Sequence, residues 1–387
     1  MVMDSSKILY FITEDWFFCS HFLARAVAAR DAGFDVVVVA RENSLGGKIR
    51  DHGIKFVPFP ISRRSVNPFR ELMTVFRLIC IYRRERPALV HHIALKPIMY
   101  GSIAAMFSGR PKIVNAPIGL GFVFSSSSWK AMILRPLSRL GLKVLLNPRG
   151  SRVVFENNDD LGSFVASGIV RAHDAVLIRG AGVDTDMFSF VPEPEGVAVV
   201  ILTARMLWDK GIGEYVEAAR LLRRRGHEAR FLLVGDPDKE NPAAIPVKIL
   251  KDWQAEGVVE WLGQREDIPV LLAQSHIVCL PSYREGLPKS LLEGLATGRA
   301  VVATDVPGCR EAVRHGVNGY LVPAKDPVAL ADALEKLIID KKLRREMGAA
   351  SRDLAVTEFI SARIEAETLE VYFQLTNTLR NTQAAIS

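Results

Sequence analysis

The sequence predicts an α/β protein with two Rossmann-like, doubly wound domains that face each other across a cleft, and three observations support this. The chain has 387 residues, which suits two domains of ordinary size. Short runs rich in Val, Ile and Phe alternate with helix-like stretches in both halves, as expected for parallel sheets covered by helices. Pro192, Pro194 and Gly196 interrupt this alternation midway, as a linker does.

The first domain is expected over residues 1–190. Helical spacing of apolar residues predicts helices over 22–32 and 69–86, which separate short buried strands. The expected strands are 7–12, 35–40, 55–59, 88–92, 112–116 and 152–156.

The second domain is expected over residues 191–360, where the alternation begins again. Its expected strands are 197–203, 230–234, 258–262, 277–281, 300–303 and 319–322. Helices are predicted over 328–337 and 343–359. A last amphipathic helix over 364–379 belongs to the C-terminal segment, about 361–387, which is expected to pack back on the first domain.

Composition and termini indicate a cytoplasmic protein with a folded core. Hydrophobic residues make up 49% of the chain, and no segment is a signal peptide or a run of about 20 apolar residues that would span a membrane. The spacing of the four cysteines fits free thiols rather than a metal or redox motif. They are Cys19, Cys80, Cys279 and Cys309.

The net charge of +7 is concentrated in the first half. No acidic residue occurs between Glu85 and Glu156, whereas bases are frequent there. They are Arg86, Lys96, Arg110, Lys112, Lys130, Arg135, Arg139, Lys143, Arg149 and Arg152. Two stretches of the basic half, 69–86 and 129–146, combine basic residues with apolar residues at helical spacing. One interpretation is peripheral binding to the anionic inner face of the cytoplasmic membrane, with no nucleic-acid partner; the other is core-facing helices with a solvated basic side.

The strongest chemical pattern lies directly after the expected strand 277–281. Glu285 and Glu293 flank a loop in which Gly286 and Pro288 indicate a tight turn leading into a helix. Free backbone N–H groups at that helix start would favour an anion. The two carboxylates are spaced to contact different ends of an extended ligand, such as a sugar and a ribose. The alternative is two solvated acids.

A second pattern follows the first strand of the second domain. Arg205 and Lys210 lie in one strand-to-helix loop, 203–211. A departing diphosphate develops negative charge, which without a metal must be met by fixed cations and helix N-termini. The alternative is that both are surface charges.

These motifs, together with Leu177-Ile178-Arg179-Gly180-Ala181-Gly182-Val183-Asp184-Thr185-Asp186-Met187-Phe188, resemble those of family 4 retaining glycosyltransferases of GT-B fold. Segments 85–97 and 119–124 resemble the bacterial branch that builds capsule, O-antigen and N-glycan precursors on polyprenyl diphosphate lipids. The resemblance covers nearly the whole chain. It implies a glycosyltransferase that moves a hexose or N-acetylhexosamine from a nucleotide diphosphate-sugar, UDP-linked, to a lipid-linked saccharide.

The resemblance also assigns roles. It implies that Glu285 contacts the donor sugar, Glu293 the ribose, and Arg205 with Lys210 the diphosphate. The loop that would help hold the sugar comprises Gly286, Leu287, Pro288 and Lys289. The resemblance implies that the anomeric configuration is retained by front-face attack, assisted by the donor's own phosphate, without an enzyme nucleophile. Neither a metal nor another cofactor is expected.

Several positions depart from the family or have a simpler reading. The segment 13–21 is a loop without the usual glycine pair, and its aromatic residues are expected to face the lipid. His21 and Gly119 are further candidate substrate contacts, although Ile118 stands where many relatives have histidine. His91 and His92 are more typical of structural histidines. Asp184 is expected to cap a turn, and the Asp184–Asp186 pair is not expected to bind a metal.

Other functions are compatible with parts of this pattern. A nucleotide-sugar epimerase of the same architecture, a transferase with a soluble acceptor and a noncatalytic sugar-binding protein remain alternatives. A dinucleotide-dependent oxidoreductase is disfavoured, because no G-x-G-x-x-G motif follows the first strand.

Overall fold

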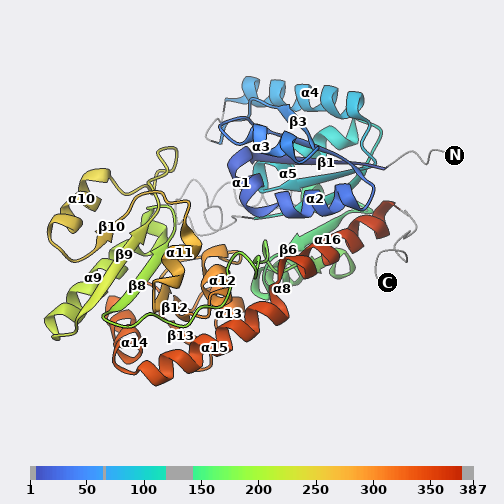
Figure 1. Ribbon diagram of the computed structural model, residues 1–387. Coiled ribbons are helices and arrows are strands. Elements are labelled where there is room, and N and C mark those ends of the chain that lie inside the picture. Colours follow the sequence, from blue (N-terminus) through green and yellow to red (C-terminus); the bar gives the residue numbers. More distant parts are fainter. Residues whose placement is uncertain (1–5, 64–66, 119–142, 377–387) are drawn as a thin grey trace. The chain divides into compact units, whose positions relative to one another are not determined.

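The protein divides into two compact α/β units (Figure 1). The computed structural model describes residues 6–63, 67–118 and 143–376. The first unit combines Met1–Arg179 with Ile364–Ser387, and the second spans Gly180–Arg363. The division falls before the proline-rich joint, because Val183 and Phe188 are buried in the core of the second unit. Two parallel-sheet units are the predicted fold class.

The described part of the first unit contains one parallel sheet in the order β3-β2-β1-β4-β5-β6-β7. Its strands are β1 (Lys7–Glu14), β2 (Asp35–Arg41), β3 (Lys55–Pro58), β4 (Leu89–Ile93), β5 (Lys112–Ala116), β6 (Arg152–Phe155) and β7 (Ala175–Leu177). The order reverses direction between β1 and β4. Six of these strands were predicted, and the half-buried β7 was not.

Helices cover both faces of this sheet, so alternate residues of β1 enter different cores. Ile8 and Tyr10 join a core shared with α2 and α16, whereas Leu9 and Phe11 join one shared with α4 and α5. The helices are α1 (Asp15–His21), α2 (Leu23–Asp31), α3 (Gly46–Asp51), α4 (Pro68–Glu85), α5 (Leu95–Met106), α8 (Asn158–Ala166), the 3₁₀ helix η1 (Ala172–Asp174) and α16 (Ser361–Thr376).

The predicted loop over 13–21 is wrong, because α1 follows β1 directly at Asp15. The buried Asp15 carboxylate accepts hydrogen bonds from the backbone N–H groups of Trp16, Asn43 and Leu45 at 2.7, 2.8 and 3.0 Å. It holds the start of α1 against the segment after β2. A fixed carboxylate thus anchors this turn, which lacks the glycine pair usual in the family that the sequence resembles.

The aromatic residues of this segment have different environments. Phe18 is buried in the core of the first unit, so the expectation that it faces a lipid is wrong. Trp16 and Phe17 are half-buried, and the Phe17 ring stacks on His21 with 4.2 Å between centroids. Phe18 is apolar because it lies on the face of α1 that packs into the core, and not because it contacts a ligand.

The C-terminal helix α16 packs on the first unit from Ile364 onward, as predicted. Tyr372 is buried on α16 and donates a hydrogen bond to the Tyr10 hydroxyl at 2.8 Å. The Tyr372 oxygen also lies 2.7 Å from His91 Nδ1. A buried polar contact therefore joins the two ends of the sequence.

The helix predicted over 69–86 is present as α4. Leu78 and Tyr82 face the core, but Phe69, Leu72 and Phe76 are exposed, so the core-facing interpretation is wrong for that part of the helix. The second basic stretch, 129–146, lies mostly outside the described residues. Within the described ranges, every helix is too short or too polar to cross a bilayer.

The second unit has a parallel sheet in the order β10-β9-β8-β11-β12-β13. The strands are β8 (Ala198–Thr203), β9 (Ala229–Val234), β10 (Glu260–Trp261), β11 (Ile277–Leu280), β12 (Ala300–Thr304) and β13 (Gly319–Val322), all at predicted positions. The helices are the 3₁₀ helix η2 (Trp208–Lys210), α9 (Ile212–Arg224), α10 (Val247–Ala255), α11 (Ile268–Ala273), α12 (Lys289–Ala296), α13 (Cys309–Ala312), α14 (Pro327–Ile339) and α15 (Lys341–Glu358). Residues of α9 and α14 enter the core on one face, and residues of α12 and α15 enter the core on the other.

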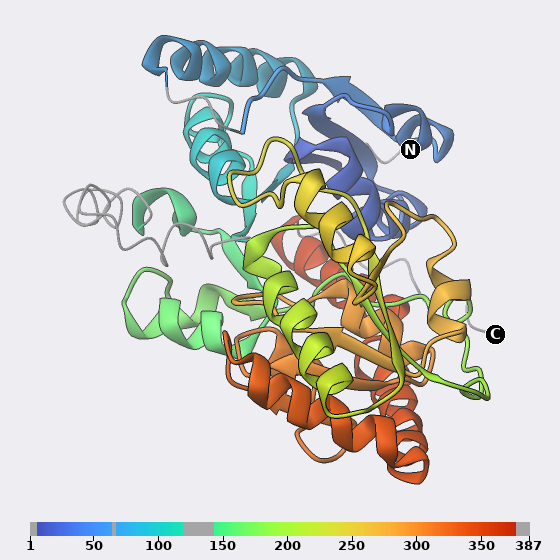
Figure 2. The ribbon, with the colours of Figure 1, turned by 90° about the vertical axis from the view of Figure 1, so that its left-hand side faces the viewer.

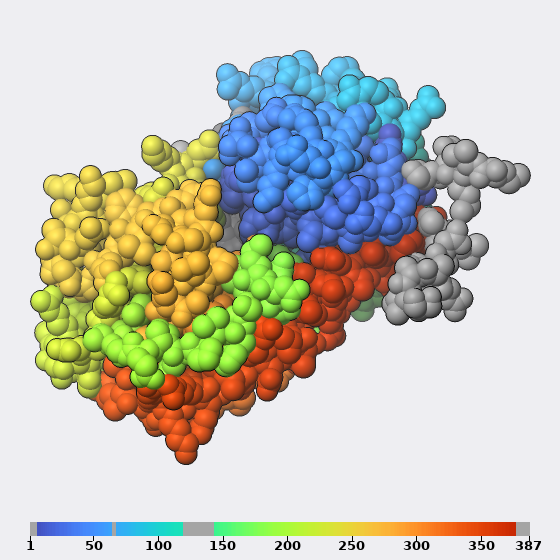
Figure 3. All heavy atoms as spheres, viewed as in Figure 1, coloured from blue at the N-terminus to red at the C-terminus, as the bar shows by residue number. Residues whose placement is uncertain are grey.

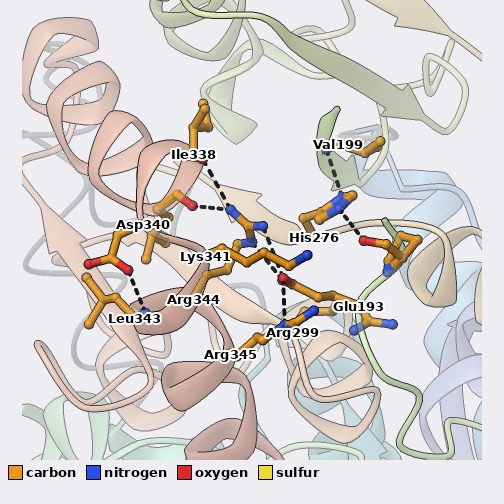
Figure 4. Close-up of polar contacts among 12 residues, drawn as sticks. Glu193, Val199, His276, Arg299, Ile338, Asp340, Lys341, Leu343, Arg344 and Arg345 are labelled. Atoms are coloured by element: carbon orange, nitrogen blue, oxygen red, sulfur yellow. Dashed lines mark hydrogen bonds and ion pairs between the residues drawn. The ribbon is translucent and has the colours of Figure 1, made fainter. Parts of the chain in front are cut away.

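The predicted joint, 191–196, is tied to the second unit by polar contacts (Figure 4). Glu193 accepts from Arg344 at 2.7 Å, and both side chains are buried. His276 accepts from the Val199 N–H through Nδ1 and lies 3.0 Å from the Pro194 carbonyl through Nε2. Because Nδ1 is an acceptor, Nε2 carries the proton, and the neutral imidazole bridges the joint to the sheet.

We expect the protein to lose stability as the pH falls below about 6.5, because buried His92 must stay neutral in the folded state. Burial lowers the pKa of His92 from 6.5 to about 4. Its contribution is complete above the unfolded-state pKa and is lost as the pH falls toward the folded-state pKa. The free energy of unfolding, measured with urea, should be about 2 kcal/mol lower at about pH 5 than at about pH 7.5 because of His92 alone.

The neighbouring buried histidine acts in the same direction, because burial also lowers the pKa of His91. Equal unfolding free energies at the two pH values would contradict a neutral His92 in the folded protein.

Candidate active site

The site is built where the strand order of the second sheet reverses. The chain passes from β8 to β9 on one side and from β11 to β12 on the other, while β8 and β11 are neighbours. The loops that follow these two strands therefore start side by side and diverge. In open α/β sheets, ligands bind outside the carboxyl ends of the strands at this point. The loops that begin here carry Arg205, Lys210 and Glu285.

Lys210 and Glu285 form an ion pair between the two loops. Lys210 Nζ donates to Glu285 Oε1 at 2.5 Å, and both side chains are largely buried. The backbone supports the pair, since the Tyr283 N–H donates to the Asp209 carbonyl at 2.9 Å. Two residues singled out separately in the sequence thus lie together.

Arg205 is held by a third loop. Its guanidinium pairs with Asp238, 2.7 Å from Nη1 to Oδ2, and the Met206 N–H donates to the Asp236 carbonyl at 3.0 Å. Asp236 and Asp238 follow β9. Asp238 was missed by sequence reasoning, because a polar loop without periodicity gives no sign of its partner.

The Glu285 loop is shaped by a close backbone approach. Gly308 has a φ of +81°, and a Cβ there would lie 2.4 Å from the Gly286 carbonyl oxygen. The Thr304 hydroxyl donates to the Ser282 carbonyl. The loop after β12 therefore fixes the backbone that presents Glu285. Gly308 was also missed, since its glycine requirement depends on this tertiary contact.

The helix expected after Pro288 is present. Pro288 is the N-cap of α12, which begins at Lys289. Leu287 is buried in the core, so only its backbone can face a ligand. The backbone N–H groups at the start of α12 are directed past the helix N-terminus, toward the segment that carries Glu285. The Leu291 N–H donates to the Pro288 carbonyl at 3.0 Å, which closes the first turn.

Glu293 lies one turn inside α12, and its side chain is largely buried. Burial raises the pKa of its carboxyl, and Lys289, 3.6 Å away between Nζ and Oε1, opposes that shift. The carboxyl is thereby easier to protonate than an exposed one and has a nearby cation that favours its ionised form. Both forms can hydrogen-bond a hydroxyl pair.

The remaining candidates lie elsewhere. His21 is half-buried at the end of α1 in the first unit, and Gly119 lies outside the described residues. His92 lies 2.8 Å from Asn115 and 3.0 Å from Tyr82, which supports its structural interpretation.

Asp184 caps a turn as expected. Its Oδ1 accepts from the N–H groups of Asp186 and Met187 at 3.0 and 2.9 Å. Within residues 6–63, 67–118 and 143–376, no cluster of three or more His, Cys, Asp or Glu side chains is arranged to hold a metal ion.

Comparison with known proteins identifies glycosyltransferase families in both halves of the chain. The family described as glycosyl transferase 4-like matches residues 7–154, and glycosyl transferases group 1 matches residues 197–340. The N,N'-diacetylbacillosaminyl-diphospho-undecaprenol alpha-1,3-N-acetylgalactosaminyltransferase of Campylobacter jejuni is 30% identical over 355 residues, covering 87% of this chain and 91% of that protein.

Two further proteins extend the comparison. The UDP-Gal:alpha-D-GlcNAc-diphosphoundecaprenol alpha-1,3-galactosyltransferase of Escherichia coli is 23% identical, covering 80% of this chain and 81% of that protein. The crystal structure of HepE from Anabaena in complex with UDP-glucose superposes with a TM-score of 0.75 at 21% identity, covering 95% of this chain and 99% of that one.

The fold and the matched families define the class of this protein as a glycosyltransferase of GT-B fold. Within that class, the chain belongs to the family 4, group 1 glycosyltransferases. Relatives whose names specify an undecaprenyl diphosphate-linked substrate match it over most of its length.

Proposed function

We propose that the protein transfers a hexose or N-acetylhexosamine from a UDP-sugar to a saccharide carried on a polyprenyl diphosphate lipid. The Campylobacter jejuni and Escherichia coli relatives support this acceptor class, because their names specify diphosphate lipids of that kind. The Escherichia coli relative's name also specifies a UDP-linked donor. The product would serve surface polysaccharide or glycan assembly at the cytoplasmic face of the membrane.

The observation that carries the proposal is the Lys210–Glu285 ion pair at the strand-order reversal, with Arg205 beside it in the same loop. Each cation is balanced by a carboxylate in the free protein. A diphosphate at this edge would share both cations, and the α12 N-terminus would add its amides. As the sugar–oxygen bond breaks, negative charge grows on the diphosphate, where these groups stabilise it most.

The sugar and ribose would lie on either side of that diphosphate. Glu285 accepts hydrogen bonds from sugar hydroxyls, and Glu293 holds the ribose hydroxyls. The acceptor oxygen attacks the anomeric carbon on the face from which the diphosphate leaves, so the configuration is retained. The acceptor proton passes to the departing phosphate oxygen, and neither a metal ion nor an enzyme nucleophile is required.

Donor choice and stereochemistry are tested together. UDP-sugars should raise the melting temperature more than matched GDP-sugars, because only a bound nucleotide stabilises the folded state. With a lipid diphosphate saccharide as acceptor, NMR of the product should show the anomeric configuration of the donor. Turnover should survive EDTA. An inverted product, or donor isomerisation in the absence of acceptor, would refute the assignment.

A further inference from the structure

Helix α4 exposes a stripe of large apolar side chains to solvent. A helix on a globular protein normally turns its polar face to solvent. On α4 the outward face carries Phe69, Leu72, Met73 and Phe76, whose exposed fractions are 83%, 70%, 50% and 59%. Their spacing of three and four residues places them in one stripe. Single exposed apolar residues are common, but a contiguous row marks an interaction surface.

The opposite face of α4 is firmly attached to the first unit. Leu78 and Tyr82 are fully buried, and Glu85 accepts from Lys55 at 2.8 Å with its own side chain buried. Glu71 pairs with Lys96 at 3.0 Å. The helix therefore packs on the first unit through one face, made of Leu78, Tyr82 and Glu85. The exposed apolar stripe is a different face of the same helix.

The helix is also formed before any partner binds. Asn67 caps its N-terminus by accepting from the N–H groups of Phe69 and Arg70, and Pro68 occupies the first turn. In Figures 1 to 3, α4 lies along the outer edge of the first unit, in light blue.

The arginines beside this stripe indicate an anionic partner. Arg70, Arg77 and Arg84 recur every seven residues along one flank and are exposed. Arg70 and Arg77 have no ion-pair partner within the part of the chain that the structure describes. Both acids of α4 point to the unit and are paired. A second copy of this chain would bring the same cations together, whereas an anionic leaflet attracts them.

We propose that α4 is the membrane-docking element of the protein, lying flat on an anionic bilayer. Phe69, Leu72, Met73 and Phe76 enter the boundary between headgroups and acyl chains, and the Arg70–Arg77–Arg84 row contacts lipid phosphates. This deepens, and rests on, the proposed use of a lipid-linked acceptor. It brings the first unit to the surface in which that acceptor is anchored.

Flotation with vesicles separates the apolar and ionic contributions. The triple variant Phe69→Ser, Leu72→Ser, Phe76→Ser should bind vesicles of phosphatidylglycerol and phosphatidylcholine on the order of 100-fold more weakly than the wild type. Its melting temperature should not change, because these side chains are exposed. A matched control replaces exposed apolar residues of the second unit, as Val270→Ser, Val328→Ser, Ile339→Ser. The control should bind like the wild type.

The arginine row is tested in the same assay. Arg70→Gln with Arg77→Gln should weaken binding to the anionic vesicles by about tenfold or more and make binding less sensitive to salt. Binding to pure phosphatidylcholine should be weak for both proteins. Lys248→Gln with Lys251→Gln on α10 is the control for a loss of two exposed positive charges.

The outcomes distinguish this inference from the proposed function. If the serine triple variant floats as the wild type does, or if α4 instead mediates a dimer in sedimentation without vesicles, the docking proposal is overturned. If flotation depends on α4 but no lipid-linked acceptor is used, docking stands and the acceptor assignment fails. With both correct, the triple variant loses turnover on vesicles yet keeps it with a detergent-soluble, short-chain acceptor.

Discussion

Lys210→Ala should lower kcat by a factor of about 100 to 1,000, because Lys210 is the more buried of the two cations that we propose to stabilise charge on the leaving diphosphate. Interactions that strengthen in the transition state affect kcat more than donor binding. Steady-state kinetics with the donor varied at a saturating acceptor concentration would measure this. Arg205→Ala should have a smaller effect, since the Arg205 side chain is 43% exposed.

A loss of activity in Lys210→Ala could also follow from a loss of stability, and this effect must be separated from an effect on catalysis. Removing the ammonium leaves the Glu285 carboxylate largely buried without its partner, which costs about 1–3 kcal/mol of stability. Combining Lys210→Ala with Glu285→Gln removes both charges and should restore stability, while turnover remains low. Recovery of kcat in the double variant would show that Lys210 acts only by neutralising Glu285. Lys251→Ala on the exposed face of α10 should change neither quantity.

The strands were predictable from sequence because both faces of each sheet are covered. β5 (Lys112–Ala116) and β13 (Gly319–Val322) match their predicted bounds, since apolar runs bounded by polar or glycine residues mark buried parallel strands. β7 has three half-buried residues and no such run. The start of α1 was missed because Asp15 obtains its partners, Asn43 and Leu45, from the segment after β2.

The residues of the candidate site were singled out one by one from the sequence, but their arrangement in space could not be predicted. Charged and glycine residues after apolar runs indicated Lys210 and Glu285 separately. Their ion pair depends on β8 and β11 being neighbours, which follows from the strand order and not from either loop. Asp238 illustrates the same limit, because its distance from Arg205 in sequence is bridged only by the pairing of β8 with β9.

Gly211→Ala should destabilise the protein by about 3 kcal/mol or more and also lower kcat. Gly211 follows Lys210 and has a φ of +69°, and a Cβ there would lie 2.0 Å from the Pro281 carbonyl oxygen at the end of β11. Backbone cannot give way as a flexible side chain can. The loop carrying Lys210 must therefore move away from the loop carrying Glu285.

Gly226→Ala provides the matched comparison. Gly226 also has a positive φ, +85°, but a Cβ there meets nothing within 4 Å. It should cost only the backbone strain, about 1–2 kcal/mol, and leave kcat unchanged. Urea unfolding and steady-state kinetics on both variants isolate the contact with Pro281 from the cost of the positive φ. Equal losses of stability would mean that the two loops are not held together at Gly211. A larger loss confined to Gly211→Ala, with reduced turnover, would mean that the close approach of β8 and β11 loops sets the position of the leaving-group cation.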